Sequence, residues 1–90
     1  MIMAYKTAFE KLFADHFDRF SESEQRIIVK KIEILKNNPD HPSLRTQSLH
    51  RYEDLYESSV SMGIRVIWRL KRDTIILQDV GRHDILKKYG

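Results

Sequence analysis

The spacing of apolar residues changes partway along this 90-residue chain, and that change limits the folds it can adopt. In the first third, apolar side chains recur every three or four residues, which is the spacing of an amphipathic helix. Beyond the middle of the chain they alternate with polar ones, at the two-residue period of a half-buried strand. Helices followed by strands predict an α+β domain, and at this length all of residues 1–90 belong to a single domain.

Two helices are predicted in the first part of the chain. The apolar spacing predicts a first helix over about residues 6–19, on which His16 is expected to be a partly buried bystander. Ser21 and Glu24 have the spacing of a capping box, which marks the start of the second helix. That helix ends before Pro39, because proline disfavours the helical conformation of the residue that precedes it. The two helices therefore form an antiparallel hairpin.

Three antiparallel strands are predicted after a polar loop over residues 39–51. They cover residues 54–60, 64–71 and 74–80, and tight turns join them. Residues 5–8 form a short edge strand before the first helix. The predicted order is β-α-α-β-β-β with a short C-terminal helix or tail, and the helix hairpin covers one face of the sheet while leaving the other free.

Composition excludes several classes of protein and site. The chain has no cysteine, which excludes disulfides and a thiolate nucleophile, and it has no apolar run near the ~20 residues of a membrane-spanning helix. A cytoplasmic protein is expected. No metal-ligand spacing, paired carboxylates or glycine-rich phosphate loop is present. Residues 61–90 carry seven Lys and Arg against three Asp and Glu, and such a basic excess attracts a polyanion.

The C-terminal segment combines side chains that can cleave RNA without a metal. Arg82, His83 and Tyr89 follow an apolar strand and a glycine turn, and they can hold a phosphate, move a proton and stack on a base. Arg65 and Arg69 are four residues apart on one strand, so their side chains point to the same face of the sheet. We expect this basic face to meet the C-terminal segment.

Three stretches of the sequence resemble the RelE/ParE superfamily of bacterial toxins. They are Leu55-Tyr56-Glu57, Gly63-Ile64-Arg65-Val66-Ile67-Trp68 and Val80-Gly81-Arg82-His83. The resemblance implies the toxin of a type II toxin–antitoxin pair. In the RelE branch such a toxin cleaves mRNA in the ribosomal A site, without a cofactor, and binds a cognate antitoxin. Two alternatives are a ParE-like inhibitor of DNA gyrase and an orphan RelE-like domain without toxicity.

The resemblance also implies roles for individual residues. Arg65 matches the strand arginine that contacts the scissile phosphate, and His83 matches a position that acts in acid–base catalysis. Tyr89 falls where RelE has a C-terminal tyrosine. RelE carries catalytic lysines on the preceding strand, whereas this chain has Tyr56 and Ser58 there, so the histidine-bearing members are the better comparison.

The expected RNA contacts extend beyond the catalytic residues. The basic residues assigned to RNA binding are Arg82, Arg69, Lys87 and Lys88. Histidines in the loop before the sheet serve some members of the family, which makes His41 and His50 additional candidates.

Each functional assignment has a structural alternative. Arg65 can pair with Glu57 across the hairpin, and Tyr89 can anchor the C-terminal segment on the sheet. His41 can be an ordinary loop residue. Trp68 belongs to the apolar set of its strand and is expected in the core.

Overall fold

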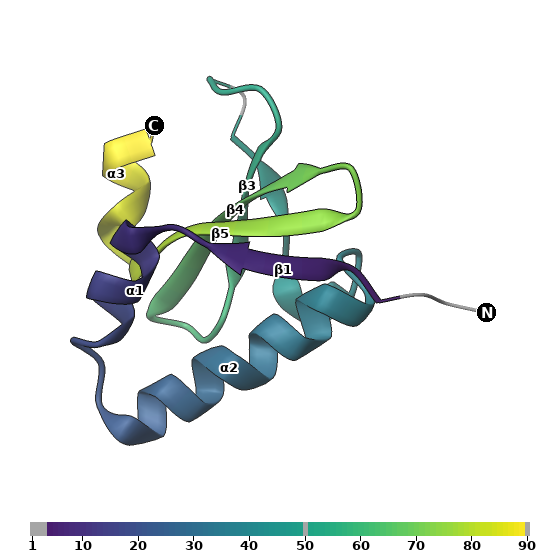
Figure 1. Ribbon diagram of the computed structural model, residues 1–90. Helices are drawn as coiled ribbons and strands as arrows, with labels where there is room; N and C mark the ends of the chain where they lie inside the picture. Colours follow the sequence, from purple (N-terminus) through teal and green to yellow (C-terminus); the bar gives the residue numbers. More distant parts are fainter. Residues whose placement is uncertain (1–3, 50, 90) are drawn as a thin grey trace.

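The computed structural model describes residues 4–49 and 51–89, without the side chains of residues 86 and 88, and has helices packed on a mixed sheet (Figure 1). The elements are β1 (Lys6–Phe9), α1 (Lys11–Phe17), α2 (Glu22–Asn37), the 3-10 turn η1 (Pro42–Leu44), β2 (Gln47–Ser48), β3 (Leu55–Ser59), β4 (Ile64–Lys71), β5 (Thr74–Arg82), the 3-10 turn η2 (His83–Ile85) and α3 (Leu86–Tyr89). The predicted α+β class and element order are confirmed.

The sheet has five strands in the order β1-β5-β4-β3-β2, and only β1 runs parallel to its neighbour. The predicted edge strand before the first helix is therefore confirmed, one residue later than expected. It takes up residues 6–9, which the helical spacing had assigned to the helix, so the prediction of a helix over 6–19 was wrong at its start. The two-residue strand β2 lies in the expected polar loop and was not predicted.

The helices cover one face of the sheet, where the main core lies. Phe13 of α1 and Ile28 and Leu35 of α2 pack against inward-facing residues of β4 and β5. In Figure 1, α2 runs along this side of the strands, starting at the predicted capping box of Ser21 and Glu24. The first and second helices thus bury part of the apolar stripes that the spacing predicted, while Leu12 and Ile27 remain exposed.

Trp68 lies in this core, as predicted. It is 3% exposed, its ring centroid is 4.7 Å from that of Tyr56, and its indole N–H donates to Ser58 Oγ at 2.8 Å. Ser58 is itself buried and shares a 2.7 Å hydrogen bond with Thr46. Tyr56 and Ser58 of β3 therefore pack around the indole of Trp68.

The opposite face is only partly free, which corrects the expectation of an open face. A smaller cluster of Leu55, Ile67 and Ile85 lies there, and Leu49 and Tyr89 pack against it. The C-terminal segment therefore folds back over one end of this face.

A bulge in β5 interrupts the alternation of its side chains. The pairing between β4 and β5 shifts at Ile67, so that Gln78 is the extra residue. Leu77 and Val80 consequently both face the helix-side core, although they are three residues apart. Between them, Asp79 pairs with Ile67 of the other face. The bulge therefore lets a core strand carry two consecutive polar residues away from the helix-side core.

Gly81 lies within β5 and not in a turn, which corrects the predicted glycine turn. A Cβ on Gly81 would be 3.0 Å from Ile85 Cδ1. The absence of a side chain at this position allows η2 to pack back against the strand that precedes it.

Candidate functional site

A buried carboxylate joins the first and last helices of the molecule. Asp79 is 0% exposed, and its Oδ1 lies 2.6 Å from His16 Nδ1 and accepts the Val80 N–H at 2.8 Å. Its Oδ2 accepts the Tyr89 hydroxyl at 2.9 Å. An ionised carboxylate only accepts hydrogen bonds, so His16 Nδ1 carries the hydrogen in this pair. Asp79 of β5 thus holds one side chain of α1 and one of α3.

The sequence interpretation of His16 as a bystander was wrong. The side chain is partly buried, at 22% exposure, as expected, but it is fixed by Asp79. One signal could have found this contact. Asp79 stands in an otherwise apolar strand, and a carboxylate buried there needs a hydrogen-bonding partner from another element.

Tyr89 anchors the C-terminal helix, which confirms the structural alternative for this residue. Its ring packs against the cluster of Leu55 and Ile67, and meets Tyr52 edge-on at 6.2 Å. Burial, together with the hydrogen bond to Asp79, raises the pKa of Tyr89 to about 12. At neutral pH the phenol therefore stays protonated, and its hydroxyl donates to Asp79.

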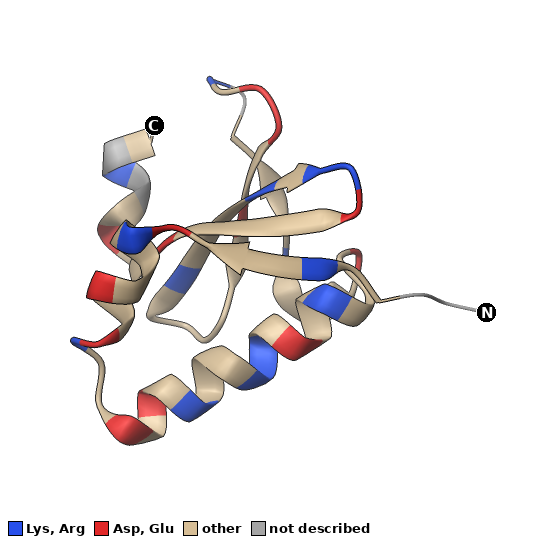
Figure 2. Cartoon of the chain, viewed as in Figure 1, with Lys and Arg blue, Asp and Glu red and all other residues tan. Residues whose placement is uncertain are grey.

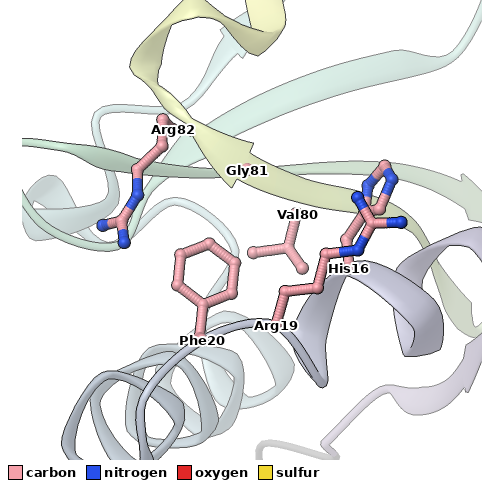
Figure 3. Close-up of a pocket in the computed structure, with 6 residues that line it drawn as sticks. All are labelled: His16, Arg19, Phe20, Val80, Gly81 and Arg82. Carbon is pink, nitrogen blue, oxygen red and sulfur yellow. The ribbon is translucent and has the colours of Figure 1, made fainter.

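Two adjoining hollows lie at this end of the molecule. The first has a volume of about 260 Å³ and opens between the end of α1 and the end of β5 (Figure 3). Its lining residues are His16, Arg19, Phe20, Val80, Gly81 and Arg82. The second, of about 370 Å³, shares three of these and adds residues of the C-terminal segment, so that it is lined by His16, Gly81, Arg82, Asp84, Ile85 and Lys87.

Arg82 lies on the helix side of the sheet, because it pairs with Ile64, a residue of the helix-side core. Its guanidinium binds both carboxylate oxygens of Glu24 at 2.7 and 3.3 Å, and sits 4.8 Å from the centre of the Phe20 ring. Arg65 pairs instead with Gly81, one position along, and so faces the opposite side. The expectation that Arg65 and Arg82 share a surface was therefore wrong.

The ion pair between Arg82 and Glu24 leads to a prediction about acid stability. The hydrogen bond from Arg82, assisted by the Ser21 N–H, lowers the pKa of the Glu24 carboxyl to about 2. A lowered carboxyl pKa stabilises the fold above pH 4.5, and this contribution is lost as the pH falls toward 2. Thermal melts between pH 5 and pH 2 should therefore show a weaker pH dependence for Glu24→Gln than for the native chain. Glu22→Gln, on the same helical turn, should keep the native pH dependence because the Glu24 contact is intact. The prediction would be contradicted if the melting temperatures of the two variants changed equally with pH.

Arg65 pairs with Glu57, as its structural alternative predicted. Its Nε lies 3.1 Å from Glu57 Oε1, and its Nη1 donates to the carbonyls of Ser61, Met62 and Ile64. Within the described part of the chain Nη2 has no hydrogen bond, so one edge of the guanidinium can still meet a phosphate oxygen. The β3–β4 turn thus fixes the direction of this arginine.

Glu57 is buried beneath this arginine. It is 4% exposed, and its Oε2 has no hydrogen-bond partner among the residues that the structure describes. Burial raises the pKa of the Glu57 carboxyl, while Arg65 acts in the opposite direction. The carboxylate therefore depends on Arg65 for its charge compensation.

The remaining predicted residues are dispersed. His83 begins η2 and is exposed, as is Lys87 of α3. Arg69 shares the face of Arg65, and its Nε and Nη2 donate to Gln78 Oε1. His50 and the Lys88 side chain lie outside the described residues. His41 is the loop residue that its structural alternative predicted, since its Nδ1 accepts the Ser43 N–H and caps η1.

Basic and acidic residues are interspersed over much of the surface (Figure 2). They alternate along α2, and the β4–β5 turn also carries both signs. The basic excess of the last thirty residues therefore does not form one continuous patch on a single face. Arg65 and Arg69 lie on one side of the sheet and Arg82 on the other.

No group of three or more metal-binding side chains comes together within residues 4–49 and 51–89. None of the helices described is both long and apolar enough to cross a membrane.

Comparison with known proteins places this fold. No protein-family model matches the chain, and no curated protein matches it. Solved toxin structures do match. The archaeal RelE–RelB complex from Pyrococcus horikoshii gives a TM-score of 0.72 at 19% identity, over 89% of this chain and 96% of that one. The E. coli DinJ–YafQ toxin–antitoxin complex gives a TM-score of 0.76 at 11% identity, over 93% of this chain and 98% of that one. The RelBE2 toxin–antitoxin complex of Mycobacterium tuberculosis gives a TM-score of 0.74 at 14% identity, over 90% of this chain and 100% of that one. With its two helices packed on a mostly antiparallel five-stranded sheet, the chain has the RelE-like toxin fold.

Proposed function

We propose that this chain is the toxin of a type II toxin–antitoxin pair and that it blocks translation in the cytoplasm by cleaving mRNA in the ribosomal A site. The fold it shares with RelE and YafQ supports the toxin class. The observation that carries the nuclease assignment is the pairing of Arg65 with Gly81, which brings a fixed arginine next to the segment of His83 and Tyr89.

The reaction needs three kinds of group and no metal. A base removes the proton of the 2′-hydroxyl, whose oxygen then bonds to phosphorus while the bond from phosphorus to the 5′-oxygen breaks. An acid protonates that 5′-oxygen, so the products are a 2′,3′-cyclic phosphate and a 5′-hydroxyl. A fixed cation stabilises the charge that builds on the phosphate oxygens.

The residues of the C-terminal end supply such groups in this proposal. Arg65 holds the scissile phosphate through the guanidinium edge that Glu57 and the turn carbonyls leave open. His83 exchanges protons with the substrate near neutral pH. Tyr89 stacks on a base with the part of its ring that is not buried, while its hydroxyl hydrogen stays with Asp79. Arg82, Arg69, Lys87 and Lys88 contribute to RNA binding by charge.

Induced expression in a bacterial host tests this function. Pulse labels of protein and DNA synthesis should show that protein synthesis stops first. His83→Ala should restore growth, because loss of an acid–base group lowers cleavage by about 10²–10⁴-fold. Arg65→Lys should also restore growth, since lysine keeps the charge but not the planar two-pronged contact.

Matched controls separate catalysis from charge and folding. Lys71→Ala removes one positive charge at the far end of the hairpin and should remain fully toxic. Circular dichroism and melting curves should show that all variants are folded. Full toxicity of both site variants would contradict the nuclease assignment, and an early stop of DNA synthesis would favour the gyrase inhibitor.

We also propose a cognate antitoxin as the partner of this chain. The support is that the matching RelE and YafQ structures are complexes with RelB and DinJ. An antitoxin that covers the C-terminal end would block the proposed site.

A further inference from the structure

We propose that His16, oriented by the buried Asp79, is the general base of the cleavage reaction, and that His83 acts as the acid. This inference rests on the proposed function and adds a catalytic residue to it. The geometry that supports it is the contact of a partly exposed imidazole with a fully buried carboxylate at the mouth of two hollows.

The contact with Asp79 fixes one tautomer of the His16 ring. Because Nδ1 donates to the carboxylate at 2.6 Å, the unshared electron pair of the neutral ring is on Nε2. Among residues 4–49 and 51–89, Nε2 has no hydrogen-bond partner, and the ring lines both hollows. A buried carboxylate that orients a histidine and stabilises its protonated form is the arrangement found behind the base of serine hydrolases.

The carboxylate is itself held so that it cannot turn away. Val80 N–H binds the same oxygen as His16, and the Tyr89 hydroxyl binds the other. Asp79 therefore has a partner on each oxygen, and its orientation is set by β5 and α3 together. If the contact only satisfied a buried charge, a histidine with part of its ring still in solvent would not be needed, since any small donor could serve.

The hollows present chemistry that suits an RNA strand. In the first one the Arg19 side chain lies beside His16, whereas Arg82 lies at the other end of the hollow, beyond the Phe20 ring (Figure 3). The charged and titratable groups around the ring are Asp79 of β5, Tyr89 of α3, Asp15 of α1, Arg19 after α1, Arg82 of β5, and Asp84 and Lys87 of the C-terminal segment. The Arg19 guanidinium can bind a phosphate next to the attacked nucleotide, while the Arg82 guanidinium is held by Glu24.

The step assigned to His16 is a single proton transfer. Nε2 accepts the 2′-hydroxyl proton as the oxygen bonds to phosphorus, and the imidazolium that forms is stabilised by Asp79. The bond from phosphorus to the 5′-oxygen breaks, and the His83 imidazolium protonates that oxygen. Both rings then exchange their protons with water, which restores the starting state.

Replacing His16 by asparagine is the sharpest test. The asparagine amide reaches the position of Nδ1, so it can keep the bond to Asp79 but cannot take a proton. Bacterial ribosomes programmed with an mRNA of known sequence and an empty A site provide the assay, read by primer extension. We expect the single-turnover rate of His16→Asn to fall by about 100-fold or more, with an unchanged melting temperature.

The pH dependence distinguishes a base from a structural contact. The native rate should rise as His16 loses its proton, and His16→Asn should lack this limb of the profile. Glu33→Gln, at an exposed position of α2, should keep the native rate and profile. A His16→Asn variant that cleaves at the native rate while His83→Ala does not cleave would overturn the role of His16 and leave the function standing.

A second measurement does not depend on activity. Long-range proton–nitrogen NMR spectra of the native chain should show the neutral His16 ring with its proton on Nδ1. A proton on Nε2 would overturn the inference whatever the cleavage rate. If the native chain does not cleave mRNA at all, the proposed function and the role of His16 fall together.

Discussion

Replacing Arg65 by alanine is expected to cost about 3–5 kcal/mol of folding free energy near neutral pH, because it leaves the buried Glu57 charge unpaired. The guanidinium contacts Glu57 Oε1 at 3.1 Å and also ties down three carbonyls of the β3–β4 turn. Urea denaturation followed by circular dichroism measures the loss.

The loss should depend on pH in a definite direction. Burial already raises the pKa of Glu57, and removal of Arg65 removes the opposing influence. When the folded-state pKa of a carboxyl is raised, the free energy of unfolding falls as the pH rises from 4.5 through that pKa. The difference between Arg65→Ala and the native chain should therefore be largest at neutral pH and shrink toward pH 4.5.

The double variant Glu57→Gln/Arg65→Ala is the matched control. It removes the charge together with its partner and should be more stable at neutral pH than Arg65→Ala alone. An Arg65→Ala loss that is independent of pH and equal to that of the double variant would show that the turn contacts, not the charge, matter. This coupling is also why Arg65→Lys is the better variant for tests of toxicity.

Replacing Trp68 by alanine should be about as damaging, at roughly 3–5 kcal/mol, because a large buried aromatic is lost from the core. The indole stacks on Tyr56 and donates to Ser58. Equilibrium denaturation in urea, with unchanged slope, is the measurement.

Trp68→Phe separates the ring from its polar contact. Phenylalanine keeps an aromatic surface against Tyr56 but cannot donate to Ser58, whose hydroxyl retains Thr46 as a partner. We expect a smaller loss than for alanine. Equal losses for the two variants would mean that the hydrogen bond, and not the packing, dominates at this position.

Periodicity predicted most of the fold and little of the site. The alternation in residues 64–71 and the helical stripe of α2 reflect local geometry, and both were confirmed. The start of α1 was misplaced because residues 6–9 pair with β5, a contact between distant parts of the chain. The side on which Arg82 lies, opposite to Arg65, depends on the register of two strands, which no local pattern contains.

The contact between His16 and Asp79 was missed for the same reason. These residues are 63 positions apart, and nothing in the helical spacing of α1 distinguishes a bystander histidine from one with a buried partner. A search for charged residues inside apolar strands would have singled out Asp79 and Glu57, both buried here. From the sequence, Asp79 entered only the charge count of residues 61–90.

The bulge at Gln78 makes this end of the molecule sensitive to the register of β5. With Gln78 kept and regular alternation after Leu77, Asp79 would face the helix-side core and Val80 would face away from it. Removal of Gln78 would instead straighten the strand and leave Asp79 opposite Ile67 and Val80 opposite Val66, so that His16 and Tyr89 keep their common partner. A shift of pairing that absorbs the extra residue, without any substitution in the residues that form the site, is therefore enough to separate both side chains from Asp79.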